Sequence, residues 1–246
     1  MAPRRLTLLL IGMLGLASAS AVRAYQTSAG EFFDFGAPRS LAEAAASGRT
    51  DKLQALVAAG ADVNAQGIEG MTALLWALTR LSKNGVAWLL QHQADPNVIF
   101  ARDGKSATSF AAGLEDQWFL REVLAHGGDV NIRNPMNGRT PLGEAMASGR
   151  DDNARLIIAA GADLNTVDSR GMTPLIEAAA KQKYELVHEM LMAGADPRVQ
   201  PPQWRGKTVL SVIRRSPVPQ DSPQYPWQMK VIELLKQKGL DVERGQ

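Results

Sequence analysis

Apolar residues recur along this chain in two kinds of short segment, which alternate from about residue 38 to residue 242. The first kind is rich in alanine and includes Ala44, Ala45, Ala77, Ala111, Ala112, Ala145, Ala178 and Ala179. The second kind is richer in large aliphatic residues and includes Leu56, Leu89, Leu90, Ile157, Ile158, Leu191 and Leu235. The alternation predicts pairs of short helices, in which a thin first helix lets neighbouring pairs approach and the second fills the interface. Because one pair cannot bury its apolar faces alone, the pairs are expected to stack.

Two polar markers recur in register with these segments. The turn marker reads GADVN at Gly60, QADPN at Gln93, GGDVN at Gly127, GADLN at Gly161 and GADPR at Gly194, in steps of 33, 34, 34 and 33 residues. The second marker opens the first helix, and it stands at Thr72, Ser106, Thr140, Thr173 and Thr208. From Thr72 to Thr173 each opener precedes its turn marker by 21 residues. Two markers in one register over five units predict a repeat protein.

The marker residues have the chemistry of helix boundaries. Thr140 and Thr173 are hydroxyl N-caps, and each is followed by a proline at the first helical position. Gly161 and Gly194 suit the left-handed conformation just past a second helix, and the Asp and Asn that follow suit a tight turn. The sequence therefore predicts where each helix begins and ends.

With these markers the sequence resembles the ankyrin repeat family, whose pattern is G-x-T-P-L-H-x-A-A, a second helix and then G-A-D-x-N. The resemblance covers roughly residues 38–242, and it implies an all-α solenoid of about six stacked helix pairs with β-hairpin fingers. The repeats are expected at approximately 38–65, 66–98, 99–132, 133–166, 167–199 and 200–242, within a domain of residues 38–246.

The chain departs from the family pattern at several positions. Gln93 replaces the turn glycine, Thr108 replaces a packing leucine and Arg198 replaces the turn asparagine. The third repeat, which contains Thr108, therefore fits the family least well. The histidine of the first-helix motif is absent, and its positions hold Leu75, Ser109, Gly143 and Ile176.

Residues 1–24 are typical of a secretory signal peptide. Arg4 and Arg5 precede an apolar run over residues 6–16, and small residues follow up to Ala24. The run is too short to span a bilayer, although an uncleaved membrane anchor is the alternative. Cleavage after Ala24 fits best, with Ala21 as a second site. We therefore expect a periplasmic protein of a Gram-negative cell or a secreted protein, with no membrane span after cleavage.

Both ends of the repeat array look modified. Residues 25–37, an N-terminal linker or cap, contain Phe32, Phe33 and Phe35, which we interpret as a plug over the first repeat; a partner-binding hook is the alternative. Residues 216–227 form a proline-rich insertion between the last two helices, and we interpret it as a solvated loop, with an extended docking segment as the alternative. The prolines predict that the final helix begins at about residue 228.

Net charge depends on whether the signal peptide is counted. The whole chain has 27 basic and 25 acidic residues and a net charge of +2. Removal of residues 1–24 takes away three arginines and no acid, which leaves 24 basic against 25 acidic residues. Because the mature chain is not basic overall, we expect no nucleic-acid binding.

The sequence contains no arrangement typical of catalysis or of a bound metal or cofactor. The chain has no cysteine, which excludes zinc–thiolate sites, thiol catalysis and disulfides. No phosphate loop, dinucleotide-binding turn or nucleophile elbow is present. The chain has three histidines, His92, His126 and His188. They fall on different predicted second helices, so a metal site is the minor interpretation. One position of the first helix holds a carboxylate in three repeats, as Glu43, Glu144 and Glu177. Stacked helices would place these carboxylates about 10 Å apart, which is too far for paired acid–base catalysis.

The resemblance implies that a partner binds the concave face, which is made of the fingers and the exposed edges of the first helices. The fingers are expected near residues 65–71, 98–105, 132–139, 166–172 and 199–207. Basic side chains outnumber acidic ones there, and apolar side chains lie among them. The candidate partner-binding residues are Arg80 and Lys181 on first helices, and Phe100, Arg102, Lys105, Arg133, Met136, Arg139, Arg170, Trp204, Arg205 and Lys207 on fingers. We expect this basic stripe to contact an acidic protein surface; the alternative is that its charges only solvate exposed loops.

These features together indicate an exported scaffold that is not an enzyme, is a monomer when free and binds another protein. Its expected role is that of an adaptor, stabiliser or inhibitor of an envelope protein or exported enzyme. A binder of an anionic envelope polymer and an enzyme with an unrecognised site are the alternatives. The sequence does not identify the partner, because repeat proteins use one scaffold for many ligands.

Overall fold

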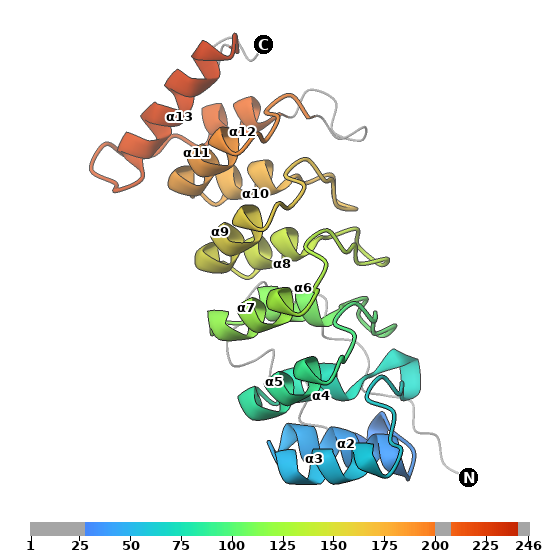
Figure 1. Cartoon of the computed structure of the whole chain (residues 1–246). Coiled ribbons are helices and arrows are strands. Elements are labelled where there is room, and N and C mark those ends of the chain that lie inside the picture. The colour runs from blue at the N-terminus through green and yellow to red at the C-terminus, as the bar shows by residue number, and fades with distance from the viewer. Residues whose placement is uncertain (1–27, 200–207, 241–246) are drawn as a thin grey trace.

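The computed structural model describes residues 28–199 and 208–240, and over these ranges twelve α-helices form six stacked pairs (Figure 1). The pairs are α2 (Ala37–Ala46) with α3 (Thr50–Ala58), α4 (Ala73–Thr79) with α5 (Lys83–Gln91), α6 (Ala107–Ala112) with α7 (Gln117–Ala125), α8 (Pro141–Ala147) with α9 (Asp151–Ala159), α10 (Pro174–Ala180) with α11 (Tyr184–Met192), and α12 (Val209–Arg215) with α13 (Tyr225–Gln237). First helices contact first helices of the next pair, and second helices contact second helices. The predicted all-α solenoid is confirmed.

The openers cap the first helices as their chemistry predicts. The hydroxyl oxygens of Thr72, Ser106, Thr140 and Thr173 each accept a hydrogen bond from the backbone N–H three residues later, at 3.1–3.4 Å. Pro141 and Pro174 occupy the first turn, where no backbone donor is needed. Replacing such a cap typically costs about 1 kcal/mol.

The turn markers end the second helices in the left-handed conformation. The glycines at 60, 127, 161 and 194 have φ between 85° and 101°. Gln93, which stands where the pattern has glycine, adopts the same region with a φ of 66°. A side chain in that region costs roughly 1 kcal/mol, so the stack imposes the turn here despite the missing glycine.

The asparagine of each turn marker ties its repeat to the next one. The side-chain oxygens of Asn64, Asn97, Asn131 and Asn165 accept the backbone N–H of an aspartate in the following marker, at 2.7–2.8 Å. Arg198 stands where the next asparagine is expected, and its Nη2 donates to the carbonyl of Lys238 at 2.9 Å. The substitution thus preserves a link between repeats by a longer side chain.

The alanine positions of the first helices lie in one continuous core. Ala44, Ala77 and Ala145 are fully buried, as are Leu89 and Ile157 of second helices. Thr108, which replaces a packing leucine, is also fully buried, and its hydroxyl oxygen has no hydrogen-bond partner among the described residues. The least regular repeat therefore carries a buried polar group that contributes nothing to cohesion.

The fingers are short hairpin turns, and no residue of the described ranges lies in a regular β-strand. Isolated bridges join Gln66 with Thr72 and Phe100 with Lys105, and the backbone N–H groups of Asn134 and Asp168 donate across their turns to Arg139 and Met172 at 2.8 and 3.0 Å. Asp103 and Asp168 accept backbone N–H groups two residues ahead through Oδ1, at 3.0 and 2.9 Å. These side-chain bonds use backbone donors that a strand ladder would need.

The aromatic segment before α2 packs against the first fingers. Phe32 and Phe33 are 1% exposed, whereas Phe35 is 93% exposed. The Phe32 carbonyl accepts the backbone N–H of Ile68 at 2.6 Å, and its ring lies 5.6 Å from that of Trp76. Two of the three phenylalanines therefore fill the interior at the start of the array.

At the other end, the final helix begins earlier than the sequence indicated. α13 begins at Tyr225 instead of about residue 228, because Pro226 lies in its first turn, where proline is tolerated. The side-chain oxygen of Gln224 accepts the backbone N–H of Tyr184 at 2.8 Å, which fastens the insertion to α11. No helix in the described part of the chain has the length and apolar character that a membrane crossing requires.

Candidate functional site

Successive fingers line one side of the stack and are joined to each other (Figure 1). The backbone N–H of Ala101 donates to the carbonyl of Glu69 at 2.7 Å, and that of Ser169 donates to Asn137 at 2.8 Å. Together with the adjoining edges of the first helices, the fingers make a continuous surface, termed here the finger face. Backbone hydrogen bonds between repeats hold it, so the backbones of these fingers keep fixed relative positions.

At the N-terminal half of the finger face, basic side chains rest on aromatic rings. The Arg102 guanidinium lies 4.6 Å from the centre of the Phe32 ring, and its Nε donates to a carboxylate oxygen of Glu69 at 2.7 Å. Arg80 lies 4.4 Å from the centre of the Trp76 ring. Such contacts contribute about 0.5–1 kcal/mol at exposed sites and hold the cations in place.

Apolar residues of the fingers divide into buried and exposed groups. Phe100 is 2% exposed and its ring lies 5.8 Å from that of Phe32, so its expected role as a partner contact is wrong. Met136 is 63% exposed, Ile68 is 47% exposed and Ile99 is 36% exposed. The finger face therefore offers aliphatic side chains, while its aromatic rings support the fold.

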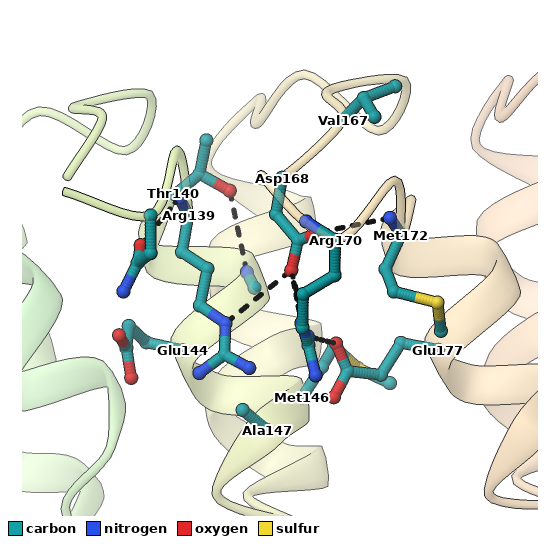
Figure 2. A network of polar contacts seen from close by, with 12 residues as sticks. Arg139, Thr140, Glu144, Met146, Ala147, Val167, Asp168, Arg170, Met172 and Glu177 are labelled. Atoms are coloured by element: carbon teal, nitrogen blue, oxygen red, sulfur yellow. Dashed lines mark hydrogen bonds and ion pairs between the residues drawn. The ribbon is translucent and has the colours of Figure 1, made fainter. Parts of the chain in front are cut away.

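In the fourth and fifth repeats, two arginines meet at one buried carboxylate (Figure 2). Oδ2 of Asp168 accepts a hydrogen bond from Nε of Arg170 at 2.9 Å, forms an ion pair with Nη2 of Arg170 at 2.8 Å, and lies 3.7 Å from Nε of Arg139. Arg170 Nη2 also donates to Glu177 at 3.0 Å. The side chain of Asp168 is only 7% exposed, so the carboxylate at the centre of the network is largely shielded from solvent.

Lys181 extends this network through Glu177, and Lys105 forms a separate ion pair with Glu144 on the neighbouring first helix. Lys105 Nζ lies 3.5 Å from Glu144, and Lys181 Nζ lies 3.5 Å from Glu177. Lys181 Nζ also donates to the carbonyl of Ala147 at 3.0 Å. Glu144 and Glu177 are thus buried ion-pair partners.

The basic groups of this half are more exposed than the acidic ones. The side chains of Arg170, Lys181 and Lys105 are 49%, 35% and 32% exposed. The side chains of Glu144 and Glu177 are 6% and 10% exposed. A cationic outer layer therefore covers an anionic inner layer.

Arg170 keeps its positive charge firmly. Burial alone would lower the pKa of its guanidinium, but the hydrogen bond that Arg170 donates to Asp168 and the negative charge of Glu177 outweigh burial and raise that pKa. The guanidinium is therefore charged throughout the neutral pH range.

Arg133 stands apart from the buried carboxylates. It is exposed, and its Nη2 donates to the backbone carbonyl of Val167 at 2.7 Å. The remaining candidate residues, Trp204, Arg205 and Lys207, lie outside the described residues. Sequence reasoning missed Asp168 as an organising residue; its position two residues before Arg170 in a finger was the available signal.

The described residues contain no metal-ligand cluster, and the hollows at the finger face are small. Among these residues, no group of three or more histidine and carboxylate side chains would hold a metal ion. Nδ1 of His92 contacts the carbonyl of Trp88 at 2.7 Å, and Nδ1 of His126 contacts that of Glu122 at 2.9 Å. The hollow beside Arg139 and Asp168 has a volume of about 10 Å³, which is about the space for one water. This geometry suits contact with a surface rather than enclosure of a substrate.

Comparison with known proteins places these repeats among described families. A family model for ankyrin repeats in three copies matches residues 41–134 and 108–201. The chain is 37% identical over 147 residues to Protein PhlB of Serratia liquefaciens, covering 60% of this chain and 64% of that protein. It is 29% identical over 155 residues to the Nuclear factor NF-kappa-B p105 subunit of Gallus gallus, covering 62% of this chain and 16% of that protein. The chain thus spans less than two thirds of the length of these relatives.

Proposed function

The chain belongs to the ankyrin-repeat family, and on this premise we propose that it binds a second protein through the finger face. Members of the family serve in general as non-enzymatic scaffolds for protein–protein interaction. Exposed Met136, Ile68 and Ile99 supply apolar contacts, and Arg102, Arg133 and Arg170 lie among them. Arginine beside apolar contact area is typical of protein interfaces.

The partner proposed for this face presents an acidic surface. The main support is the layering of charge in the third to fifth repeats, where exposed cations cover carboxylates that are 6–10% exposed. An approaching acidic protein meets the cations first, which favours encounter and orientation. Because the inner carboxylates offset part of the charge, orientation depends on individual arginines more than on net charge.

The proposed setting is the periplasm of a Gram-negative cell, or the exterior if the protein is secreted. Residues 1–24 support this by their basic start, short apolar run and small residues before Ala24. Fractionation of the host, with the mass of the purified chain, tests it. A chain that begins after Ala24 or Ala21 in the periplasmic fraction is expected; a chain in the cytoplasm with an intact N-terminus contradicts export.

Within that setting we propose the role of an adaptor, stabiliser or inhibitor of an envelope protein or exported enzyme. A stoichiometric complex is required by each of these roles. Crosslinking in the native envelope, followed by mass spectrometry of proteins that copurify with the tagged chain, identifies the partner. Turnover of a substrate by the purified chain alone contradicts the scaffold role.

The same capture experiment tests the finger face when paired variants are compared. Reversing Arg139 or Arg170 is unsuitable, because a new carboxylate beside Asp168 would disrupt the buried network. The variant Arg133→Glu with Met136→Ala instead changes two exposed finger residues. We expect it to lose the partner.

The matched control makes the same two changes on second helices, as Arg121→Glu with Met192→Ala. Arg121 is exposed and donates to Gln117 on its own helix, and Met192 is 66% exposed. We expect the control to retain the partner. Equal capture by both variants contradicts binding through the finger face.

A further inference from the structure

We propose that Asp168 positions Arg139 and Arg170 as a paired receptor for the carboxylates of an acidic segment in the protein partner. This inference rests on the proposed function and assigns a role to a residue that does not itself touch the partner. The carboxylate of Asp168 contacts both guanidinium groups, and Figure 2 shows the side chains of Arg139 and Arg170, which come from neighbouring repeats, on either side of that contact.

Both oxygens of Asp168 are engaged. Oδ1 accepts the backbone N–H groups of Arg170 and Met172, each at 2.9 Å, which fixes the carboxylate within its own finger. Oδ2 faces the guanidinium groups, at 2.9 Å from Nε of Arg170 and 3.7 Å from Nε of Arg139. One rigid carboxylate therefore sets the positions of two arginines that come from different repeats.

The arrangement leaves guanidinium donors for an incoming ligand. Arg170 uses Nε and Nη2 for Asp168 and Glu177, so within the described residues its Nη1 is not engaged in these bonds. The contact of Arg139 with Asp168 is an ion pair through Nε, and its Nη1 and Nη2 take no part in it. A guanidinium that is already held at one edge binds a second carboxylate through its other N–H groups.

Holding the arginines beforehand favours binding. A free arginine loses considerable rotamer freedom when a partner immobilises it, and a preorganised one has lost that freedom already. For two side chains we expect the effect on affinity to be roughly tenfold or more. The side chain of Arg139 is 21% exposed, so most of it is packed while part of it remains open to solvent.

This positioning role and simple electrostatics predict opposite effects for one substitution. Asp168→Asn removes a negative charge from the finger face, so net charge alone predicts tighter binding of an acidic ligand. Loss of the shared carboxylate frees the arginines, so positioning predicts weaker binding. The asparagine oxygen still accepts the two backbone N–H groups, which preserves the finger turn.

The probe is a fluorescein-labelled decaglutamate peptide, and the measurement is its fluorescence anisotropy with the purified protein at low salt. The control is Asp152→Asn, which removes the same charge from an 85% exposed carboxylate on α9. We expect Asp168→Asn to bind the peptide about tenfold or more weakly, and Asp152→Asn to bind it as tightly as the unchanged protein or slightly more tightly. Equal or tighter binding by Asp168→Asn overturns the inference, as does an unchanged protein that does not bind the peptide.

A second set of variants keeps the test decisive if Asp168→Asn lowers the melting temperature. Arg139→Gln, Arg170→Gln and the double variant form a cycle in which a paired receptor predicts that either single change loses most of the affinity. Additive losses contradict pairing. Inorganic polyphosphate serves as a second probe, and binding of polyphosphate without decaglutamate overturns recognition of protein carboxylates.

The outcomes separate this inference from the proposed function. If the Arg133→Glu, Met136→Ala variant no longer captures the envelope partner but Asp168→Asn binds decaglutamate normally, binding through the finger face is supported and the positioning role is contradicted. If Asp168→Asn weakens peptide binding but the Arg133→Glu, Met136→Ala variant still captures the envelope partner, the positioning role is supported and binding of that partner through the finger face is contradicted.

Discussion

Replacement of Phe32 tests whether the segment before α2 belongs to the folded array. Phe32 is 1% exposed, and its ring lies 5.6 Å from Trp76, 5.8 Å from Phe100 and 4.6 Å from the Arg102 guanidinium. Phe32→Ala removes all three contacts together. The backbone bond from Ile68 to the Phe32 carbonyl remains possible, so the change isolates the ring.

The expected loss follows from burial and from the ring contacts. Transfer of a phenylalanine side chain from water contributes about 1.5–3 kcal/mol, and each aromatic pair adds about 0.5–1.5 kcal/mol. Truncation of a fully buried phenylalanine to alanine typically costs about 3–5 kcal/mol. Because Phe32 lies near one end, where the segment can detach alone, we expect the lower figure of about 3 kcal/mol. For a chain of this size that lowers the melting temperature by roughly 6–12 °C.

Urea unfolding followed by circular dichroism measures the loss, and hydrogen exchange at the Ile68 amide shows whether the segment has detached. The control is Phe35→Ala, the same substitution three residues away at a side chain that is 93% exposed. We expect the control to change the free energy of unfolding by less than about 0.5 kcal/mol. If the two variants unfold alike, the segment does not plug the array.

Two further changes test the buried polar groups. Thr108→Val removes a fully buried hydroxyl that has no partner among the described residues and keeps the side-chain shape, so we expect about 1 kcal/mol of added stability in thermal melts; a lower melting temperature contradicts this. Burial raises the pKa of Tyr184 above its usual 10.0, so this residue contributes stability that is present below pH 10 and is lost as the pH rises through the folded-state pKa. As the pH is raised above about 10, the free energy of unfolding should therefore fall less for Tyr184→Phe than for the unchanged protein, as measured by urea titrations at each pH. Parallel plots of unfolding free energy against pH for the two proteins would contradict the assignment.

Much of the fold was predictable because its determinants are local. The N-cap at Thr140 and the left-handed glycine at Gly161 act on the backbone within four residues, so sequence spacing alone locates them. The resemblance implied hairpin fingers, but it did not indicate that Asp103 and Asp168 would bond their own backbones and keep these hairpins short. The start of α13 depended on whether Pro226 occupied the first turn, which residue type does not decide.

The candidate site was predictable in composition but not in arrangement. The excess of basic residues on the fingers could be counted from the sequence. Arg133 and Met136 are exposed, as residues of a contact surface must be. The sequence did not predict the burial of Phe100, since that burial depends on Phe32, which lies in a segment that precedes the repeats. The partners of Lys105 and Arg139 were equally hidden.

The sequence by itself determined the period, the helix boundaries and the need to stack, because each depends on residues within a single repeat. Only the tertiary structure decided which charges meet. Arg139 reaches Asp168, and Lys105 reaches Glu144, across the boundary between repeats. Such pairs depend on side-chain direction and on the separation of stacked units, and neither quantity is encoded in the spacing of residues along one chain.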